Sequence, residues 1–184
     1  MRIAMIGTGY VGLVSGACFS DFGHDVVCVD KDAAKIERLK RGEVPIFEPG
    51  LEALIAKKAA AGRLAFSTDL PAAVAGAEAV FIAVGTPTRR GDGHADLTYV
   101  MAAAAEIGRA LTGYAVVVTK STVPVGTNRK VAEALRAANP EASFDVASNP
   151  EFLREGAAID DFMHPDRVVV GIESARARKV MAEL

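Results

Sequence analysis

Short apolar runs recur along the chain, and most are followed by stretches in which apolar residues recur every three or four positions. The short runs predict buried strands, whereas the longer stretches predict helices. Several short runs are apolar on both faces, which is typical of a parallel sheet covered by helices on each side. The sequence therefore predicts an α/β fold with a doubly wound, mostly parallel sheet built by right-handed crossovers. The predicted strands are 3–6, 26–29, 64–66, 79–84, 115–119, 144–147 and 167–170, and the predicted helices include 51–61, 97–111 and 127–138.

The first predicted strand leads directly into the glycine-rich turn Gly7-Thr8-Gly9-Tyr10-Val11-Gly12. Gly7 permits a sharp turn, Gly9 leaves room for a pyrophosphate, and Gly12 lets the following helix pack close to the sheet. The N-terminus of that helix offers free N–H groups to phosphate. An ordinary structural turn is the alternative explanation for these glycines.

Asp30 ends the second predicted strand, 18 residues after Gly12. Its carboxylate can accept hydrogen bonds from both hydroxyls of an adenosine ribose, and it would repel a 2′-phosphate. The combined pattern predicts a Rossmann-like domain that binds NAD in preference to NADP. Lys35 is a candidate for the same ribose edge, although it can also be a solvated helix lysine.

Further candidate residues follow the carboxyl ends of other predicted strands, the edge where open α/β sheets bind ligands. The hydroxyls of Thr86 and Thr122 could contact a nicotinamide, ribose or phosphate there, or simply stabilise turns. Glu151 and Glu155 are four residues apart, so a helical turn would place both carboxylates on one face. Such a pair could position water or transfer a proton. The alternative is two exposed helix carboxylates with Arg154 as their solvated partner.

Composition narrows the remaining function classes. The 184 residues are 51% hydrophobic and carry a net charge of −2. The sequence has no basic stripe that would bind nucleic acid and no apolar run long enough to span a membrane. It also lacks the pattern of a signal peptide. We therefore predict a cytoplasmic protein with neither nucleic acid nor membrane as partner. Cys18 and Cys28 lie in apolar company and are expected to be inert core residues. No metal site is predicted, because His24, His94 and His164 lack ligand spacing.

Five motifs resemble, in order and spacing, those of one enzyme family. They are GTGYVG followed by Asp30, PIFEPGL, VGTPT, STVPVGT and NPEFLREG. Over essentially all 184 residues the chain is similar to the amino-terminal NAD-binding domain of the UDP-glucose 6-dehydrogenase (UDP-glucose/GDP-mannose dehydrogenase) family. The resemblance implies an enzyme that oxidises C6 of UDP-glucose twice, to the carboxylate of UDP-glucuronate, and reduces two NAD.

The resemblance also implies roles for individual residues. The glycine-rich turn and the matched family positions together predict NAD contacts from Gly7, Gly9, Tyr10, Val11, Gly12, Asp30, Lys35, Thr86, Thr122 and Glu155. The predicted contacts to the UDP-sugar are Glu151, Phe152, Leu153, Arg154 and Glu155. The predicted catalytic residues are Thr122, Glu151 and Glu155. Of these, Thr122 and Glu151 match residues that hold the catalytic water and support proton transfer.

One departure from the family concerns the second oxidation, which needs a cysteine thiolate near the reacting carbon. In the family that cysteine lies beyond the position matching Leu184, with an essential lysine and asparagine, and neither Cys18 nor Cys28 replaces it. The family's central helix, dimer contacts and UDP-binding domain are absent as well. We therefore expect residues 1–184 to be a truncated NAD-binding domain, inactive alone, of an enzyme that is a homodimer at full length. A dehydrogenase for GDP-mannose or UDP-N-acetylmannosamine, or a non-catalytic dinucleotide-binding module, are the alternatives.

Overall fold

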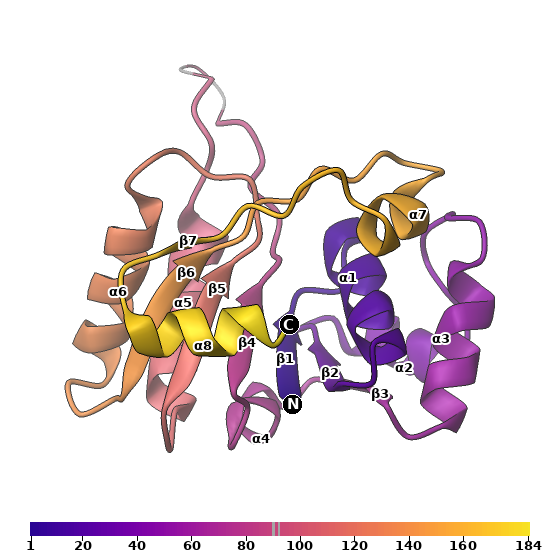
Figure 1. Ribbon diagram of the computed structural model, residues 1–184, viewed down its shortest axis with the longest axis horizontal. Helices are drawn as coiled ribbons and strands as arrows, with labels where there is room; N and C mark the ends of the chain where they lie inside the picture. Colours follow the sequence, from indigo (N-terminus) through magenta and orange to yellow (C-terminus); the bar gives the residue numbers. More distant parts are fainter. Residues whose placement is uncertain (90, 92) are drawn as a thin grey trace.

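The structure is a computed structural model that describes residues 1–89, 91 and 93–184. Residues 90 and 92, part of the predicted polar loop 89–94, lie outside the described residues. The described strands form one sheet in the order β3-β2-β1-β4-β5-β6-β7 (Figure 1). They are β1 Arg2–Ile6, β2 Asp25–Val29, β3 Leu64–Ser67, β4 Ala79–Ile82, β5 Ala115–Thr119, β6 Phe144–Ser148 and β7 Gly171–Ile172. The helices are α1 Tyr10–Asp21, α2 Ala33–Lys40, α3 Leu51–Ala60, α4 Leu70–Val74, α5 Thr98–Ala110, α6 Thr127–Ala138, α7 Ala158–Met163 and α8 Ala175–Ala182.

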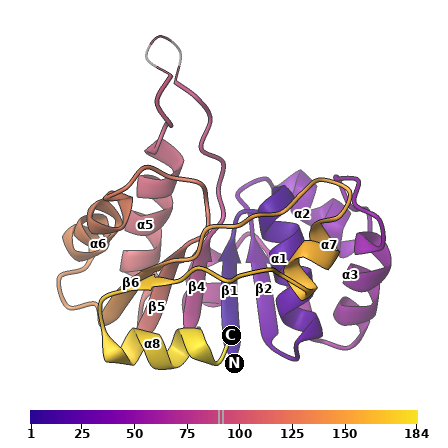
Figure 2. The same ribbon diagram turned by 45° about the horizontal axis from the view of Figure 1, so that its top comes forward.

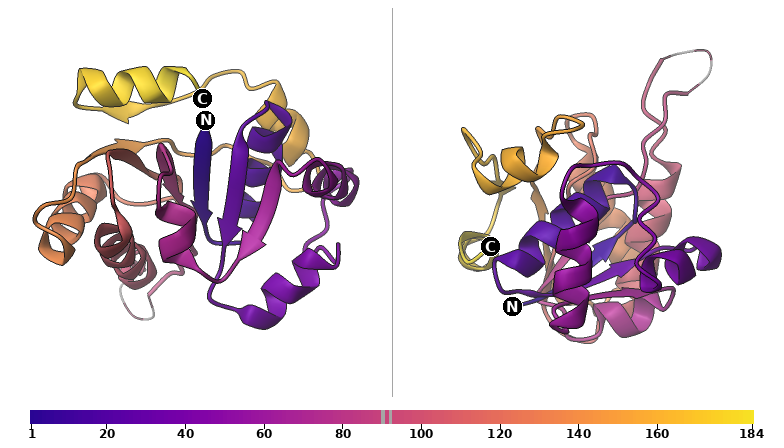
Figure 3. Two further views of the ribbon diagram at one scale, coloured as in Figure 1. Left: turned by 90° about the horizontal axis from the view of Figure 1, so that it is seen from below. Right: turned by 90° about the vertical axis from the view of Figure 1, so that its right-hand side faces the viewer.

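Helices cover both faces of the sheet, and each face has its own hydrophobic cluster. Helices α7 and α8 lie on the opposite side of the sheet from α5 and α6 (Figure 3). Successive residues of the buried strand β4 belong to different clusters. Phe81 is in the cluster that contains Leu13 of α1, and Ile82 is in the cluster that contains Ile107 of α5. The predicted doubly wound α/β fold is therefore confirmed, with β1 to β6 parallel and β7 antiparallel to β6.

The predicted strand at 167–170 is wrong. The last strand is Gly171–Ile172, and it pairs antiparallel with β6, whereas Val168 and Val169 are 67% and 41% exposed. The physical reason is the course of the connection: from β6 through α7 the chain stays at the carboxyl end of the sheet, so it enters β7 from that end and runs antiparallel to β6 (Figures 1 and 2). Residues 167–170 therefore lead up to the sheet, and the chain pairs with β6 only from Gly171 onward.

The carboxyl ends of the parallel strands meet at one edge, at the top in Figure 1. After β6 the chain crosses over this edge to α7, and it crosses back before β7, as Figures 1 and 2 both show. This crossing brings Arg154 and Gly156 into contact with Tyr10 of the glycine-rich turn that follows β1. The fold thus places the predicted cofactor and substrate segments beside one another.

Candidate functional site

The glycine-rich turn has the geometry that its sequence predicts. Gly7 has a φ of +109°, and a Cβ atom there would lie 2.5 Å from the carbonyl oxygen of Ala83. A Cβ on Gly12 would lie 2.0 Å from the carbonyl oxygen of Gly7, so the start of α1 can approach the turn only without a side chain. These two glycines therefore maintain close backbone packing between β1, β4 and α1.

Gly9 serves a different purpose, because no atom lies within 4 Å of a Cβ built on it. It is the N-cap of α1, without a capping side chain and without an acidic residue in the first turn of the helix. The helix N-terminus consequently presents backbone N–H groups beside open space. This arrangement fits the pyrophosphate of a dinucleotide.

Asp30 lies beside the same turn, at the end of β2. Its carboxylate accepts hydrogen bonds from the backbone and hydroxyl of Thr8 (3.0 and 2.6 Å), from the backbone of Asp32 (3.1 Å) and from Nζ of Lys35 (3.1 Å). Partial burial opposes ionisation, but these hydrogen bonds outweigh it and lower the pKa of Asp30 to about 2. The carboxylate is therefore charged at neutral pH and oriented, and Lys35 lies at the same edge as predicted.

Thr86 and Thr122, from the loops after β4 and β5, are brought together. The hydroxyl of Thr86 donates to the carbonyl oxygen of Thr122 (3.0 Å), and the hydroxyl of Ser121 donates to that of Val84 (2.7 Å). The hydroxyl of Thr86 thus connects two loops, 36 residues apart in the sequence, rather than closing a turn of its own. Their predicted contact with a nicotinamide cofactor stays a prediction.

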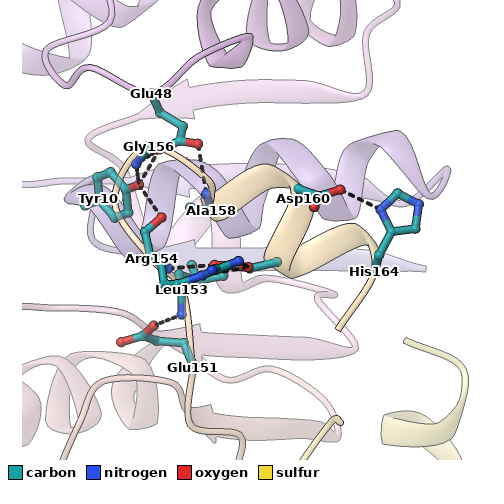
Figure 4. Close-up of polar contacts among 10 residues, drawn as sticks. Tyr10, Glu48, Glu151, Leu153, Arg154, Gly156, Ala158, Asp160 and His164 are labelled. Carbon is teal, nitrogen blue, oxygen red and sulfur yellow. Dashed lines mark hydrogen bonds and ion pairs between the residues drawn. The ribbon is translucent and has the colours of Figure 1, made fainter. Parts of the chain in front are cut away.

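The predicted helical pairing of Glu151 with Glu155 is wrong. The segment is not helical before α7 begins at Ala158, so the two carboxylates do not share a helix face. Glu151 instead accepts a hydrogen bond from the backbone of Leu153 (2.7 Å), which replaces helical bonding with a local turn (Figure 4). Gly156, with a φ of +87°, then redirects the chain into α7.

Arg154 is not the partner of the two glutamates either. Its guanidinium pairs with Asp161 of α7 (2.6 Å), and its backbone N–H donates to the same carboxylate (2.8 Å). The side chain of Arg154 is nevertheless 74% exposed. The segment Glu151–Gly156 is called the substrate segment below, because the resemblance assigns residues of it to the UDP-sugar. It is held both by its own Glu151 and by Asp161 outside it.

Sequence reasoning missed Glu48, which lies in the PIFEPGL motif between α2 and α3. This carboxylate is 6% exposed and accepts hydrogen bonds from the hydroxyl of Tyr10 and the backbones of Gly156 and Ala158 (Figure 4). The side chain of Tyr10, predicted to contact the cofactor, therefore reaches the substrate segment. The one signal in the sequence is an acidic residue within an otherwise apolar, proline-flanked stretch.

Sequence reasoning also missed a polar pair at the ends of β5 and β6. Lys120 is 4% exposed, and its Nζ donates to the amide oxygen of Asn149 (3.0 Å), whose nitrogen donates to the carbonyl oxygen of Val169 (3.0 Å). Burial lowers the pKa of Lys120 to about 8. A lysine directly after an apolar strand was the available signal.

Lys120 and Asn149 line an open cavity of about 770 Å³ below the substrate segment. Phe19, Phe81, Leu153 and Phe162 are among its apolar walls, and the ring of Phe162 lies 5.4 Å from the ammonium nitrogen of Lys120. The cavity therefore combines an aromatic wall with a buried cation at the edge of the sheet.

The two cysteines are core residues, and His164, which also lines the cavity, has an acidic partner. Cys18 and Cys28 are buried and unpaired, and burial raises the pKa of each thiol to about 12, as expected for inert core residues. His164 pairs with Asp160 of α7 (2.9 Å). Among the described residues, no group of three or more histidine, cysteine or acidic side chains is arranged to hold a metal ion. No helix in that part of the chain has the length and apolar character to cross a membrane.

Residues 1–184 match the model of a protein family described as the UDP-glucose/GDP-mannose dehydrogenase family, NAD binding domain. The chain belongs to this family. A UDP-glucose 6-dehydrogenase of Rhizobium meliloti is 64% identical to this NAD binding domain, in an alignment of 186 positions that covers 100% of the chain and 43% of that protein. The chain thus spans less than half the length of the curated relatives that it matches.

Solved structures of the family agree with the fold of this NAD binding domain. A UDP-glucose dehydrogenase of Pyrobaculum islandicum has a TM-score of 0.95 and 45% identity, over 99% of this chain and 43% of that one. A GDP-mannose dehydrogenase of Pseudomonas aeruginosa, solved as a ternary complex, has a TM-score of 0.95 and 38% identity, over 100% and 43% of the two chains. The predictions of a Rossmann-like domain and of NAD as cofactor are therefore confirmed.

Proposed function

We propose that this chain is the cofactor-binding part of a UDP-glucose 6-dehydrogenase that oxidises C6 of UDP-glucose to UDP-glucuronate. The observation that carries the proposal is the meeting, at one sheet edge, of the Gly9–Asp30 cofactor site with the substrate segment. The 64% identity to the UDP-glucose 6-dehydrogenase of Rhizobium meliloti favours this sugar nucleotide. GDP-mannose is the second substrate to test, because the dehydrogenase of Pseudomonas aeruginosa named for it shares 38% identity.

The residues present fit NAD. Backbone groups from Gly7 to Gly12 would hold the pyrophosphate, and Asp30 with Lys35 would hold the adenosine ribose. Thr86, Thr122 and Glu155 would contact the cofactor further along the edge. When bound, NAD supplies the oxidant for the C6 alcohol.

The substrate segment has the remaining roles in this proposal. Its residues from Glu151 to Glu155 would lie along the UDP-sugar, with Phe152, Leu153 and Arg154 as contacts between the two acids. Glu151, whose carboxylate is oriented by the backbone of Leu153 (2.7 Å), would accept a proton or hold a water molecule together with Thr122. Glu155 would assist from the cofactor side.

The second oxidation requires an accessible thiol, and the two thiols of this chain are buried with raised pKa values. We therefore propose that residues 1–184 are one domain of a longer enzyme, which supplies the thiol from another segment. The whole enzyme would be a homodimer, as the resemblance implies. It would be cytoplasmic, since unpaired cysteines suit a reducing compartment. The reading frame that encodes the chain gives a first check, because it should continue past Leu184 into a cysteine-bearing segment.

Calorimetric titration of the purified chain tests the cofactor site. We expect saturable binding of NAD, much weaker binding of NADP, and a smaller difference between them in Asp30→Ala. Incubation with NAD and UDP-glucose should produce no absorbance of reduced nicotinamide. Formation of UDP-glucuronate, with two NAD reduced for each UDP-glucose, would refute the requirement for a further thiol. With the longer enzyme, a panel of UDP-glucose, GDP-mannose and UDP-N-acetylmannosamine should give the highest kcat/KM for UDP-glucose, and preference for another sugar would overturn the substrate assignment.

A further inference from the structure

The carboxylate of Glu48 lies between the cofactor turn and the segment that follows Arg154, and it bonds to both. Gly156 N–H donates to Oε2 at 2.8 Å, and Ala158 N–H donates to Oε1 at 2.9 Å. The hydroxyl of Tyr10 also donates to Oε2. Figure 4 shows these groups converging on Glu48 from two segments far apart in the sequence. Several donors hold a buried carboxylate firmly, because hydrogen bonds to a charged acceptor are stronger than those between neutral groups.

Tyr10 provides the connection to the cofactor site. It is the first residue of α1 and directly follows Gly9, where the structure is open for a pyrophosphate. Its hydroxyl oxygen also accepts from the N–H of Gly156 at 3.2 Å, so this N–H lies between Tyr10 and Glu48. The side chain of Tyr10 therefore connects the helix N-terminus directly to the end of the substrate segment.

The charge state suits a permanent connection. Burial disfavours ionisation of Glu48, but the hydrogen bonds from Tyr10, Gly156 and Ala158 outweigh it and lower the pKa of the carboxyl group. Burial and the bond to Glu48 raise the pKa of Tyr10 to about 12. At neutral pH the pair is thus a protonated phenol that donates to a carboxylate, the stronger, charge-assisted kind of hydrogen bond.

We propose that Tyr10 and Glu48 are positioning residues that couple the cofactor turn to the chain from Arg154 to Ala158. NAD bound at the N-terminus of α1 would hold Tyr10, and through Glu48 it would restrict Gly156 and Ala158. By linkage, a ligand that orders the substrate segment would raise the affinity for NAD by the same factor. The coupling itself rests only on these contacts, whereas its use for a UDP-sugar rests on the proposed function.

Amide hydrogen exchange on the 184-residue chain tests the coupling, with and without saturating NAD. Exchange at Gly156 and Ala158 is compared with that of Gly62 and Arg63, whose hydrogen-bonded amides lie in the turn between α3 and β3 and report local opening away from the cofactor turn. In the wild-type chain we expect NAD to slow exchange at Gly156 and Ala158 about fivefold more than at these reference amides, the lower end of typical coupling. Glu48→Gln, which replaces an acceptor oxygen by an amide group, should speed exchange at Gly156 and Ala158 about tenfold and abolish the NAD effect.

Tyr10→Phe separates coupling from simple support of the fold. This variant retains the bonds from Gly156 and Ala158 to Glu48, so exchange without NAD should stay within about twofold of wild type. The additional slowing by NAD should be lost. A purely structural role for Tyr10 would leave that slowing intact, and this outcome would overturn the proposal. Should Glu48→Gln fail to fold, Tyr10→Phe decides alone.

Glu43→Gln is the matched control, because Glu43 lies with Glu48 in the loop between α2 and α3. Its carboxylate is exposed and pairs with Arg41 (2.8 Å). It should behave as wild type, and equal loss of the NAD effect in this control would overturn the role of Glu48. UDP-glucose added to the longer enzyme separates the two proposals. If NAD slows exchange at Gly156 there but UDP-glucose leaves residues 151–158 unchanged, the substrate assignment fails while the coupling stands.

Discussion

The cofactor turn and the substrate segment lie at the same edge of the sheet, but they are held in different ways. The turn is fixed by close backbone packing and by Asp30, which binds Thr8 only 22 residues away. The substrate segment depends on distant side chains, above all Glu48, which is 108 residues from Gly156. Substitutions in the cofactor turn should therefore destabilise the fold through steric conflict. Substitutions in the substrate segment should act through the loss of particular hydrogen-bond partners.

Gly12→Ala is expected to have the largest effect. The added Cβ would lie 2.0 Å from the carbonyl oxygen of Gly7, and neither backbone can move without shifting the turn. We expect the free energy of unfolding to fall by about 2–4 kcal/mol, as for other severe steric changes, measured by urea denaturation. Calorimetry should show NAD affinity reduced by more than about tenfold, the equivalent of 1.4 kcal/mol.

Gly9→Ala is the matched control for Gly12→Ala, because no atom lies within 4 Å of its added Cβ. Its stability should fall by no more than about 1 kcal/mol, the scale of an N-cap change. NAD binding should still weaken, since the methyl group occupies the approach of the pyrophosphate. Equal stability of Gly12→Ala and wild type would contradict the steric account of the turn.

Lys120→Met tests the buried cation beneath the substrate segment. The pKa of Lys120 falls from 10.5 to about 8 in the folded chain, so the folded state binds fewer protons than the unfolded state between these values. Stability from this group therefore rises as pH increases from about 8 to 10.5, by up to about 3 kcal/mol.

The measurement is the difference in unfolding free energy between wild type and Lys120→Met across that pH range. Taking the difference removes the opposing contribution of Cys18 and Cys28, whose raised pKa values make folded chains lose stability as pH rises above 9. We expect the difference to favour wild type increasingly toward pH 10.5. A flat difference would show that Lys120 is not desolvated.

The same contrast explains what could be predicted from the sequence. Gly7, Gly12 and Asp30 meet requirements set by their immediate backbone, so local pattern was sufficient for the turn and for the parallel sheet. Glu48 and Lys120 are fixed by partners 110 and 29 residues away, which the fold alone brings together. The helix proposed for Glu151 and Glu155 failed for this reason, because Asp161 and Glu48 take backbone N–H groups that a helix would have used.

Asp30→Asn tests the electrostatic part of the cofactor turn. The folded pKa of about 2 lies below the usual 3.8, so this carboxylate stabilises the fold above pH 4 and loses that contribution as pH falls toward 2. We expect the variant to be about 2 kcal/mol less stable than wild type at neutral pH, with the difference disappearing near pH 2. Urea denaturation at several pH values measures it. If the difference in unfolding free energy did not change with pH, the negative charge of Asp30 would contribute nothing to stability.

Glu151→Ala and Glu155→Ala give the smallest effects and the sharpest test of the substrate segment. Glu151 accepts a hydrogen bond from the backbone of Leu153 (2.7 Å), so its removal should cost about 1 kcal/mol, the typical net value of one such bond. Glu155 is exposed, and its removal should change stability by no more than about 0.5 kcal/mol, as for other surface positions. Two equivalent carboxylates on a helix face would instead give equal changes. Thermal unfolding of both variants therefore distinguishes a turn held by one side chain from a helical pair, and only the unequal result agrees with a segment whose shape is set by particular partners.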